Sequence, residues 1–387
     1  MRSGLTQVVV RFVTAIGFVA VFSTMAWAQA GRLDPTFSNF IATGANITAV
    51  EMQADGKLLV AGKFTTVGAI IRKDIARLNT DGSVDPAFNS GTGSDNIGMI
   101  LAMKIQPDGK VVVCGSFNTI NGTPHNAVAR LNPDGSVDAG FGVSGLDITF
   151  AYDMDLQPDG KILVSASNLI GSSFIARLNS NGANDGGTGQ SFFSVPPSYE
   201  YRVSFLTSEN QILVTYRMSA PNSNRINIVK VSVTGGQDMS FSAAVFGDPS
   251  DIQASARAFL AGKVLVWGRF NTANQTARNN VAVLNSDGTT DMSFDPMTSA
   301  SGTILAAAVQ SDGKVLLAGR DFAVNTFMSG NLARLVPNGQ ADVTFRAGRG
   351  ANGSIKSIKI VDGKLLIAGD FWRYQTRPRP GLARIFL

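Results

Sequence analysis

The sequence has a single cysteine, a single histidine and few charged residues in a chain of 387 amino acids. One cysteine excludes an internal disulfide framework, and one histidine excludes metal sites built from several histidines. Charged residues make up 16% of the chain, against roughly 25% in an average soluble domain. With 44% hydrophobic residues and a net charge of +5, the chain indicates neither disorder nor nucleic-acid binding through charge.

Residues 1–28 have the three parts of an export signal. Two arginines accompany the uncharged apolar stretch 12–22, and residues 26–28, Ala-Trp-Ala, form a small-x-small cleavage site. Residues 28–30 offer a second cleavage site. The alternative is an uncleaved membrane anchor, but an apolar run of about 17 residues is at the low end for a membrane span.

Cleavage removes two arginines and no acids, which lowers the net charge from +5 to +3. No cysteine follows the apolar run to carry a lipid. We therefore predict a secreted or periplasmic protein, without membrane insertion after signal cleavage, whose mature domain is residues 29–387.

Beyond residue 28 the sequence lacks helical periodicity, and a short motif recurs instead. The motif is Asp-Gly-Lys or a degenerate copy of it, and it returns about every 50 residues. The copies begin at Asp55, Asp108, Asp159, Glu209, Ala261, Asp312 and Asp362. Residues 29–387 therefore consist of seven similar units.

Each unit has the same order of strand and turn signals, which the second unit shows best. Residues 101–106 and 110–115 are apolar or β-branched runs joined by Pro-Asp-Gly, so they predict a hairpin. Residues 127–132 and 137–141 predict two further strands joined by a second turn. Seven units of four antiparallel strands predict an all-β fold, a seven-bladed β-propeller. An open β-solenoid is the alternative.

The two chain ends favour the propeller. An Asp-x-x-Phe motif closes the fourth predicted strand in most units. It begins at Asp85, Asp138, Asp238, Asp291 and Asp342, with a weaker version at Asp185. The last unit stops without this motif, whereas residues 33–37, Leu-Asp-Pro-Thr-Phe, place a copy before the first unit. We therefore predict that the N-terminal strand completes the last blade and closes the ring, which removes exposed sheet edges.

These motifs resemble the delta-60 repeat family of secreted bacterial proteins, which are predicted β-propellers of unassigned function. The resemblance covers residues 31–387 and is carried by the Gln-Pro-Asp-Gly-Lys hairpin, as at 106–110, the Ala-Arg-Leu-Asn run, as at 129–132, and the Asp-x-x-Phe closure. Units four and five depart from it, with Lys230 and Val283 where arginine recurs. The resemblance implies the fold and supplies no catalytic residues.

Residues that recur in most units are interpreted as scaffold. The arginines equivalent to Arg77 and the aspartates equivalent to Asp85 predict ion pairs within or between blades. The glycines equivalent to Gly115 predict a bulge or a close backbone approach. The Asp-Gly turns are explained by turn chemistry without calcium. Cys114 shares its position with Ala61 and other small residues, so we predict a buried filler, and no metal or cofactor is predicted.

The loops divide between two faces of the predicted propeller. The turns between first and second strands and between third and fourth strands share one face, here called the turn face. The loops between second and third strands, together with the connections between blades, are expected on the opposite face, here called the loop face. Variable loops on a rigid scaffold are the usual seat of binding.

Arginines and aromatic residues gather in the variable segments of the last and fourth units. The predicted ligand-binding residues are Arg346, Arg349, Arg373, Arg377, Arg379, Trp372, Tyr374, Arg217 and Tyr216. Arginine binds carboxylate, sulfate or phosphate groups, and aromatic rings stack on sugars or peptide side chains. The prediction is therefore an anionic glycan or an acidic protein partner on the loop face. The alternative is that these arginines are solvated loop residues.

The leading functional prediction is an exported, monomeric, non-enzymatic binding or interaction module. An extracellular glycan hydrolase or lyase using Asp, Tyr and Arg of the loop face is a second hypothesis. It needs two carboxylates about 5–9 Å apart in a concave centre. The candidate carboxylates are Asp95, Asp147, Asp248 and Asp295. His125 lies on the same face without a nucleophile motif, so no catalytic residue is predicted. A cell-surface adhesin or structural subunit is the third hypothesis.

Overall fold

The computed structural model describes most of the chain. The described residues are 29–38, 41, 45–95, 98–186, 192–193, 198–206, 211–218, 225–247, 253–298, 301–324, 327–328 and 330–387. The predicted export signal, residues 1–28, lies outside them. Within the described ranges, no helix is both long and apolar enough to cross a membrane.

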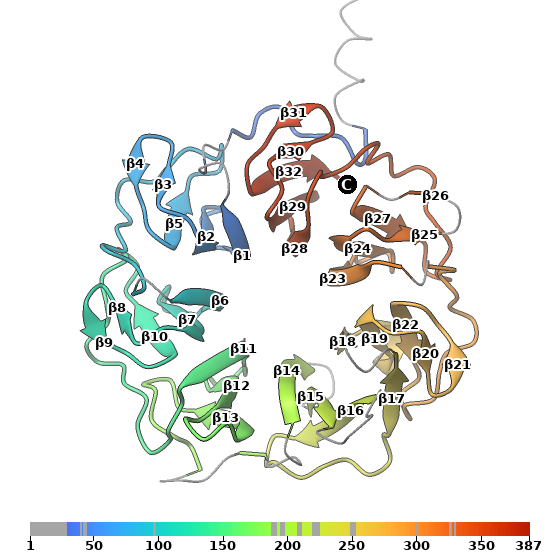
Figure 1. The fold of residues 1–387 in the computed structure, drawn as a ribbon, viewed down its shortest axis with the longest axis horizontal. Coiled ribbons are helices and arrows are strands. Elements are labelled where there is room, and N and C mark those ends of the chain that lie inside the picture. The colour runs from blue at the N-terminus through green and yellow to red at the C-terminus, as the bar shows by residue number, and fades with distance from the viewer. Residues whose placement is uncertain are drawn as a thin grey trace, which may run out of the picture.

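The described chain is all-β apart from one 3-10 turn, and its sheets stand around a central axis like the blades of a propeller (Figure 1). Each sheet is named here after its innermost strand. From the first sheet to the last, the strands are β1 (Asn46–Met52), β2 (Leu58–Lys63) and β5 (Ile75–Leu78); β6 (Met99–Ile105), β7 (Val111–Ser116) and β10 (Val128–Leu131); β11 (Phe150–Leu156), β12 (Ile162–Ser167) and β13 (Ser173–Leu178); β14 (Ser198–Leu206), β15 (Gln211–Met218) and β16 (Arg225–Ser232); β18 (Gln253–Ala258), β19 (Val264–Arg269) and β22 (Val281–Leu284); β23 (Thr303–Val309), β24 (Val315–Arg320) and β27 (Leu332–Leu335); and β28 (Ile355–Val361), β29 (Lys364–Gly369) and β32 (Leu382–Phe386).

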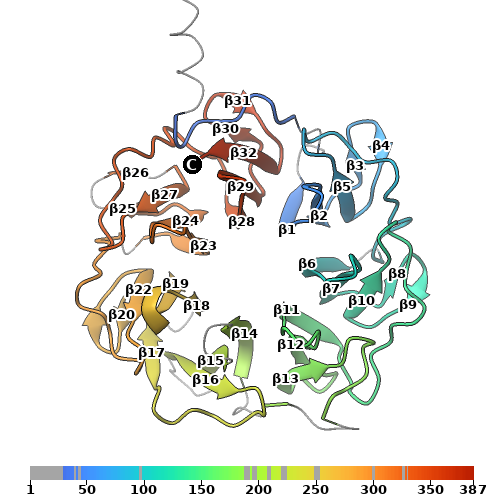
Figure 2. The ribbon, with the colours of Figure 1, turned by 180° about the vertical axis from the view of Figure 1, so that it is seen from behind.

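Small hairpins occupy the loop between the second and third strands of several sheets and lie at the outer rim (Figure 2). They are β3 (Thr66–Val67) with β4 (Ile70–Ile71), β8 (Thr119–Ile120) with β9 (Thr123–Pro124), β20 (Thr272–Ala273) with β21 (Thr276–Ala277), β25 (Ala323–Val324) with β26 (Phe327–Met328), and β30 (Arg373–Tyr374) with β31 (Arg377–Pro378). Strand β17 (Ala243–Phe246) pairs with both β16 and β20, and the 3-10 turn η1 (Leu260–Gly262) precedes β19.

The middle strand of each sheet buries both of its faces. In β7, Val111 and Val113 pack in a cluster with residues of the β1 sheet, whereas Val112 packs with residues of the β11 sheet. Side chains alternate between the two faces of a strand. A continuous β-branched run therefore belongs in the middle of a sheet that has a neighbouring sheet on each side.

In most units the expected four-stranded blade is corrected by the structure to three strands and one bridge, whereas β14, β15, β16 and β17 pair in one sheet. The predicted fourth strand is reduced to an isolated pairing, such as Leu78 with Val84 and Leu131 with Val137. The reason is the Asp-x-x-Phe motif. The Asp85 carboxylate accepts a hydrogen bond from Ala87 N at 2.9 Å, which turns the chain away from the sheet one residue after the bridge.

The connections between units also differ from the expectation that they lie on the loop face. Asn89 N donates to Asp134 O in the third-to-fourth-strand turn of the next unit, on the turn face. Further along, Ser94 pairs with Ile120 in the β8–β9 hairpin, on the loop face. Because the fourth strand is so short, each connection starts at the turn face and crosses the outer rim of the next sheet.

A buried aspartate in most units joins the three recurring motifs. Asp85 accepts hydrogen bonds from Lys57 Nζ at 2.8 Å and Arg77 Nε at 2.7 Å. The Arg77 guanidinium lies 5.1 Å from the centre of the Phe88 ring and donates to Pro133 O in the next unit at 2.6 Å. The prediction of ion pairs and hydrogen bonds within and between units is confirmed.

Other units repeat this arrangement, and two of them modify it. The repeats are Lys110–Asp138–Arg130, Lys161–Asp185–Arg177 and Lys314–Asp342–Arg334. In the fourth unit, Gln211 takes the place of the lysine and donates to Asp238 at 3.1 Å. In the fifth unit, Asp291 keeps Lys263 at 2.7 Å, and Val283 stands where the arginine recurs.

The N-terminal segment pairs with the β28 sheet at the other end of the chain. Leu33 forms an antiparallel bridge with Ile385, and Asp34 N donates to Arg384 O at 2.8 Å. The fully buried Asp34 carboxylate accepts hydrogen bonds from Lys364 Nζ and Arg384 Nε, both at 2.7 Å. Asp34 of the N-terminal segment therefore occupies in the β28 sheet the position that Asp85 occupies in the β1 sheet.

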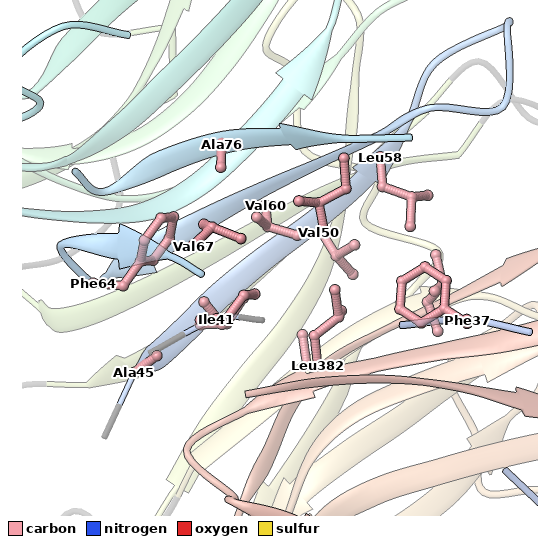
Figure 3. Packing of buried hydrophobic residues seen from close by; sticks show 14 of the residues in the cluster. Phe37, Ile41, Ala45, Val50, Leu58, Val60, Phe64, Val67, Ala76 and Leu382 are labelled. Carbon is pink, nitrogen blue, oxygen red and sulfur yellow. The ribbon is translucent and has the colours of Figure 1, made fainter. Parts of the chain in front are cut away.

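The first and last sheets also share a hydrophobic cluster, which Figure 3 shows from close by. Val50 and Val60 of the β1 sheet face Leu382 of the β28 sheet, and Phe37 of the N-terminal segment lies beside them (Figure 3). Phe37 is fully buried. Side chains from both ends of the described chain therefore bury one another.

Candidate functional site

The innermost strands of all the sheets surround the axis in both views (Figures 1 and 2). A cavity of about 290 Å³ lies between them. Its lining residues are Thr48, Leu101, Phe150, Tyr152, Arg202, Gln253, Ala254, Ser255, Trp267, Gly268, Ile304, Leu305 and Lys356. These residues occupy the part of the inner strands that is remote from the Asp-Gly turns. The cavity therefore lies on the loop-face side of the axis.

A bulge aims one residue of most inner strands into this cavity. The pairing register shifts at the same place in β1, β6, β11, β23 and β28. The extra residues are Thr48, Leu101, Tyr152, Leu305 and Lys356, and all five line the cavity. A β-bulge leaves one residue outside the pairing and redirects its side chain.

The recurring glycine at the end of the second strand explains the bulge. Gly115 pairs with Ile100 beside the register shift, and a β-carbon at Gly115 would stand 2.0 Å from Met99 O. No side chain fits at that distance, so the backbones approach closely only because glycine is present. The predicted bulge and close approach are confirmed at this position.

The lining of the cavity is positively charged and aromatic. Arg202 and Lys356 are its ionisable cations, and no carboxylate is among the lining residues. The ring centres of Phe150 and Tyr152 lie 4.6 Å apart. Lys356 Nζ donates to Asn46 Oδ1 at 2.8 Å, which holds the ammonium group on the loop-face side.

Carboxylates stand just behind the two cations. Asp370 lies 3.4 Å from Lys356 Nζ and its side chain is 41% exposed. Asp153, at the position of β11 equivalent to Arg202 of β14, is partly buried. Burial raises the pKa of Asp153, and the Arg202 charge opposes that rise. Lys356 is therefore paired with Asp370, and the charges of Arg202 and Asp153 interact, while neither acid is among the residues that line the cavity.

Trp267 breaks the repeat at the wall of the cavity. The equivalent second-strand residues are Ala61, Cys114, Ser165, Thr215, Ala318 and Ala368. Trp267 is only 9% exposed, and its indole Nε1 is buried without a hydrogen-bond partner among the described residues. A buried unpaired donor costs about 1–3 kcal/mol. A costly residue at an otherwise small position indicates a role beyond packing.

The structure places five of the predicted binding residues on one hairpin at the outer rim, where Tyr374 is buried and the other four are at least partly exposed. Trp372, Arg373, Arg377 and Arg379 belong to or flank β30 and β31. Trp372 is 50% exposed, and the Arg373 guanidinium lies 4.8 Å from its ring centre. None of these residues lines the cavity on the axis.

Arg379 occupies a repeated position rather than an exceptional one. Its Nη1 donates to the preceding carbonyl, Pro378 O, at 2.8 Å. Arg72 and Arg278 make the same bond to their preceding residues at 2.8 Å. Each of these arginines stands four residues before the alanine of the third strand, a spacing that the sequence already contains. The recurrence identifies Arg379 as part of the scaffold.

Tyr374 is not available to a ligand, in contrast to the prediction. Its side chain is fully buried, and its hydroxyl donates to Gly31 O at 2.8 Å. Burial raises the pKa of Tyr374 far above its ordinary value. The alternation of β30 turns this ring inward while its neighbours face solvent, so Tyr374 fastens the N-terminal segment to the β28 sheet.

The other predicted binding residues lie elsewhere. Arg346 N donates to Ala30 O, which places Arg346 beside the turn-face end of β32, and exposed Arg349 follows on the rim. Tyr216 and Arg217 belong to β15, on another sheet, where Tyr216 packs partly into a core cluster. Burial raises the pKa of Tyr216. The nine predicted residues therefore do not form one site.

The remaining candidates are also outside the cavity on the axis. Asp95 accepts a hydrogen bond from Asn118 N at 3.2 Å, and Asp295 lies 3.4 Å from Arg278 Nη1. Asp147 and His125 line a separate cavity of about 490 Å³ beside the β8–β9 hairpin. Asp248 lies outside the described residues.

Cys114 is fully buried, as the small-filler interpretation predicts, and burial raises the pKa of its thiol well above the ordinary value. Within the described residues, no group of three or more His, Cys, Asp or Glu side chains could hold a metal ion.

The cavity residues come from separate units, so they form no cluster of arginine and aromatic residues in the sequence that could have predicted them. A comparison of equivalent positions in different units does distinguish some of these residues. The inner-strand position occupied by Ala49, Ala102 and Ala306 carries Asp153 in the third unit and Arg202 in the fourth. Departures from a repeated small residue, rather than accumulated charge, point to the site.

Six stretches of the chain match a family model described as "Domain of unknown function (DUF5122) beta-propeller". The matched residues are 53–88, 106–141, 157–185, 262–294, 310–345 and 362–387, together just over half of the chain. The intervening part, 186–261, is unmatched, and it contains β14 with Arg202. A search of curated proteins gives no match to this sequence.

Several solved structures are similar in fold. A catalytically inactive virginiamycin B lyase from Staphylococcus aureus with Quinupristin has a TM-score of 0.56 at 14% identity, covering 90% of this chain and 98% of that one. The computationally designed Ika8 protein has a TM-score of 0.54 at 13% identity, covering 93% and 100%. Apo prolyl oligopeptidase B from Galerina marginata has a TM-score of 0.53 at 10% identity, covering 89% and 49%. Identities this low show the β-propeller fold and nothing of function.

Proposed function

The chain belongs to the DUF5122 β-propeller family, a family of unknown function, and we propose that it is an exported binding module that takes an anionic saccharide in the cavity on its axis. The scaffold of the proposal is a closed propeller of seven blades. The observation that carries it is the cavity lining, which combines two cations with three aromatic side chains and contains no carboxylate.

Ring closure is supported by the contacts of the N-terminal segment. Leu33 pairs with Ile385, and the Asp34 carboxylate accepts hydrogen bonds from Lys364 and Arg384. Asp85 accepts the equivalent hydrogen bonds in the first sheet. β1 also packs against β28. A closed ring packs the first sheet against the last, so it is the state in which all inner strands surround one cavity.

The chemistry of the lining supports the choice of an anionic saccharide. Guanidinium and ammonium groups form charge-assisted hydrogen bonds with carboxylate, sulfate or phosphate oxygens. Phe150, Tyr152 and Trp267 offer apolar ring surface, and the lining side chains of Thr48 and Ser255 offer hydroxyls. A sugar carrying an acidic group presents all three complementary features. Export through the N-terminal signal of residues 1–28 would bring the protein to such glycans.

The proposal is tested by titrating the mature chain with trigalacturonate and with neutral maltotriose. Trp372→Phe leaves Trp267 as the tryptophan of residues 29–387, so its fluorescence reports binding at the cavity. We expect trigalacturonate alone to change the fluorescence. Arg202→Ala and Lys356→Met should each weaken binding roughly 10- to 150-fold, since a hydrogen bond to a charged group contributes about 1.5–3 kcal/mol.

The rim residues provide the matched control. The triple variant Arg373→Ala, Arg377→Ala and Arg379→Ala removes three arginines without touching the cavity lining. We expect its affinity for trigalacturonate to equal that of the wild type. Loss of binding in the rim variant, equal binding of maltotriose, or full binding by Arg202→Ala would overturn the proposal. Binding of an acidic peptide in preference to trigalacturonate would replace the saccharide by a protein partner.

A further inference from the structure

Arg257 belongs to the inner strand β18 and lies two residues beyond Ser255, which lines the cavity. In β18, Ala254 and Ala256 pack into a core cluster, while Gln253 and Ser255 line the cavity. Side chains alternate along a strand, so Arg257 shares the face of Gln253 and Ser255. Two residues of antiparallel strand rise about 7 Å, which places Arg257 that far along the strand from Ser255, toward the turn face.

The acids at this depth are already engaged on the opposite side of the axis. Lys104 Nζ lies 3.1 Å from Asp155 and 3.9 Å from Glu51, and Lys359 Nζ contacts Glu51 as well. These residues belong to β6, β11, β1 and β28, so the ion pairs run continuously across four neighbouring inner strands. Both carboxylates are therefore neutralised by lysines.

Arg257 stands outside this chain of ion pairs. It is exposed, and no carboxylate of the described residues lies within salt-bridge distance of it. Its charge acts on Lys104: burial lowers the pKa of Lys104, Asp155 and Glu51 raise it above its ordinary value, and Arg257 opposes that rise. Arg257 is thus close enough to Lys104 for their charges to interact across the axis, where β18 and β6 face each other (Figure 1).

We propose that Arg257 forms a second anionic subsite, so that the preferred ligand is an oligosaccharide with acidic groups on successive residues, entering the axis end-on. This inference rests on the proposed function. One acidic group lies at Arg202 and Lys356, and the next lies deeper, at Arg257. At the depth of Arg257 the cations Lys104, Lys359 and Arg257 outnumber the acids Glu51 and Asp155, and an excess of positive charge between low-dielectric walls concentrates anionic ligands. A ligand that spans both subsites gains from both without a second association.

The proposal differs from a purely structural role in its dependence on ligand length. If Arg257 only balanced Glu51 and Asp155, its removal would affect long and short ligands equally. As a second subsite, it acts on ligands long enough to reach it. Monogalacturonate fills the first subsite, whereas trigalacturonate fills both.

The test compares both ligands on four forms of the protein, each in the Trp372→Phe background: the parent, Arg257→Ala, Arg257→Lys and Arg320→Ala. Arg320 is a matched control, an exposed arginine at the end of β24 that does not line the cavity. We expect the parent to bind trigalacturonate at least about tenfold more tightly than monogalacturonate. Arg257→Ala should lose about tenfold for trigalacturonate and less than about twofold for monogalacturonate. Arg257→Lys should recover part of that loss, and Arg320→Ala should match the parent.

Each result decides the proposal. An equal loss for both ligands, or no loss with Arg257→Ala, overturns the second subsite while Arg202→Ala still reports on the first. If neither ligand binds the parent, or if Arg202→Ala has no effect, the proposed function fails and the second subsite fails with it. The thermal midpoint of each variant separates lost binding from lost folding.

Discussion

The turn-face end of each sheet and the inner strand of the same sheet differ in how similar their residues are from unit to unit. At the turn-face ends, a lysine, an arginine and an aspartate recur with nearly identical contacts, as in Lys57–Asp85–Arg77 and Lys110–Asp138–Arg130. On the inner strands, equivalent positions carry residues as different as Ala49, Asp153 and Arg202. Repetition therefore identifies the scaffold, and departure from repetition identifies the candidate site.

The largest effect on this comparison is expected from Asp34→Ala, which removes the scaffold acid that joins the chain ends. Asp34 is fully buried, whereas the Lys364 side chain keeps 31% exposure. Removing one partner of a buried ion pair costs 3–5 kcal/mol, and the exposed lysine favours the lower end, about 3 kcal/mol. Urea unfolding measures this loss. Asp312→Ala, in an exposed turn, is the control and should lower the midpoint much less. An unchanged midpoint for Asp34→Ala would show that the chain ends contribute no stability.

Acid should weaken the scaffold through its paired aspartates. Burial raises the pKa of Asp85, but hydrogen bonds from Lys57 and Arg77 outweigh it and bring the pKa to about 2. The hydrogen bond from Lys110 similarly brings the pKa of Asp138 to about 2. Since an unfolded aspartate titrates near 3.9, these groups stabilise the fold above about pH 4. That stability is lost as the pH falls through 2.

The measurement is urea unfolding between pH 7 and pH 2. We expect constant stability down to about pH 5 and a steep decline below pH 4. Asp85→Asn should start less stable and decline less steeply, because one fewer carboxylate takes up a proton on unfolding. A parallel decline in the two proteins would show that Asp85 is not a source of the acid sensitivity.

Tyr374→Phe should have a smaller effect, because it removes one hydrogen bond from the contact between the chain ends. The lost bond is the one from the Tyr374 hydroxyl to Gly31 O, and Gly31 O keeps a second donor, Gln375 Nε2, at 3.2 Å. A net loss of about 1 kcal/mol is expected. Thermal unfolding measures it, with Tyr152→Phe as the control for a tyrosine of the cavity. A loss of saccharide affinity without a loss of stability would show that Tyr374 contributes to binding, as the sequence predicts.

The smallest effect is expected from Arg377→Ala at the outer rim. Arg377 is exposed on β31 and lies away from the cavity. Substitutions of this kind change stability by about 0.5 kcal/mol or less. Both the thermal midpoint and the affinity for trigalacturonate should match the wild type. A large drop in affinity would show that the ligand binds at the rim rather than in the cavity on the axis.

Much of the scaffold was predictable because each part rests on local chemistry. Asp108-Gly109 marks a turn, Val111–Val113 marks a strand with two buried faces, and the recurrence of Asp138 with Arg130 marks an ion pair. The fourth strand was not predictable in length. Whether residues after Val137 stay in the sheet depends on the turn that the Asp138 carboxylate nucleates, and that turn competes with strand pairing only in three dimensions.

The sequence predicted the residue types of the candidate site but not their positions. Arginine and aromatic residues were expected to bind an anionic glycan, and the cavity combines them, but from Arg202, Tyr152 and Trp267 rather than from Trp372 and Arg373. The rim arginines are close in sequence, whereas the cavity residues are contributed by separate units and meet only when the inner strands converge.

The sequence by itself determined the repeated unit, its turns, its β-branched strands and the residue types that pair within it, because these depend on neighbours a few residues apart or on a fixed repeat. Only the tertiary structure decided which residues face the axis. That choice depends on the bulges opposite glycines such as Gly115, on the inward turn of Tyr374, and on the convergence of strands from different units around one cavity. Contacts between residues of different units have no local pattern in the sequence, so their positions follow from the packing of the sheets around the axis.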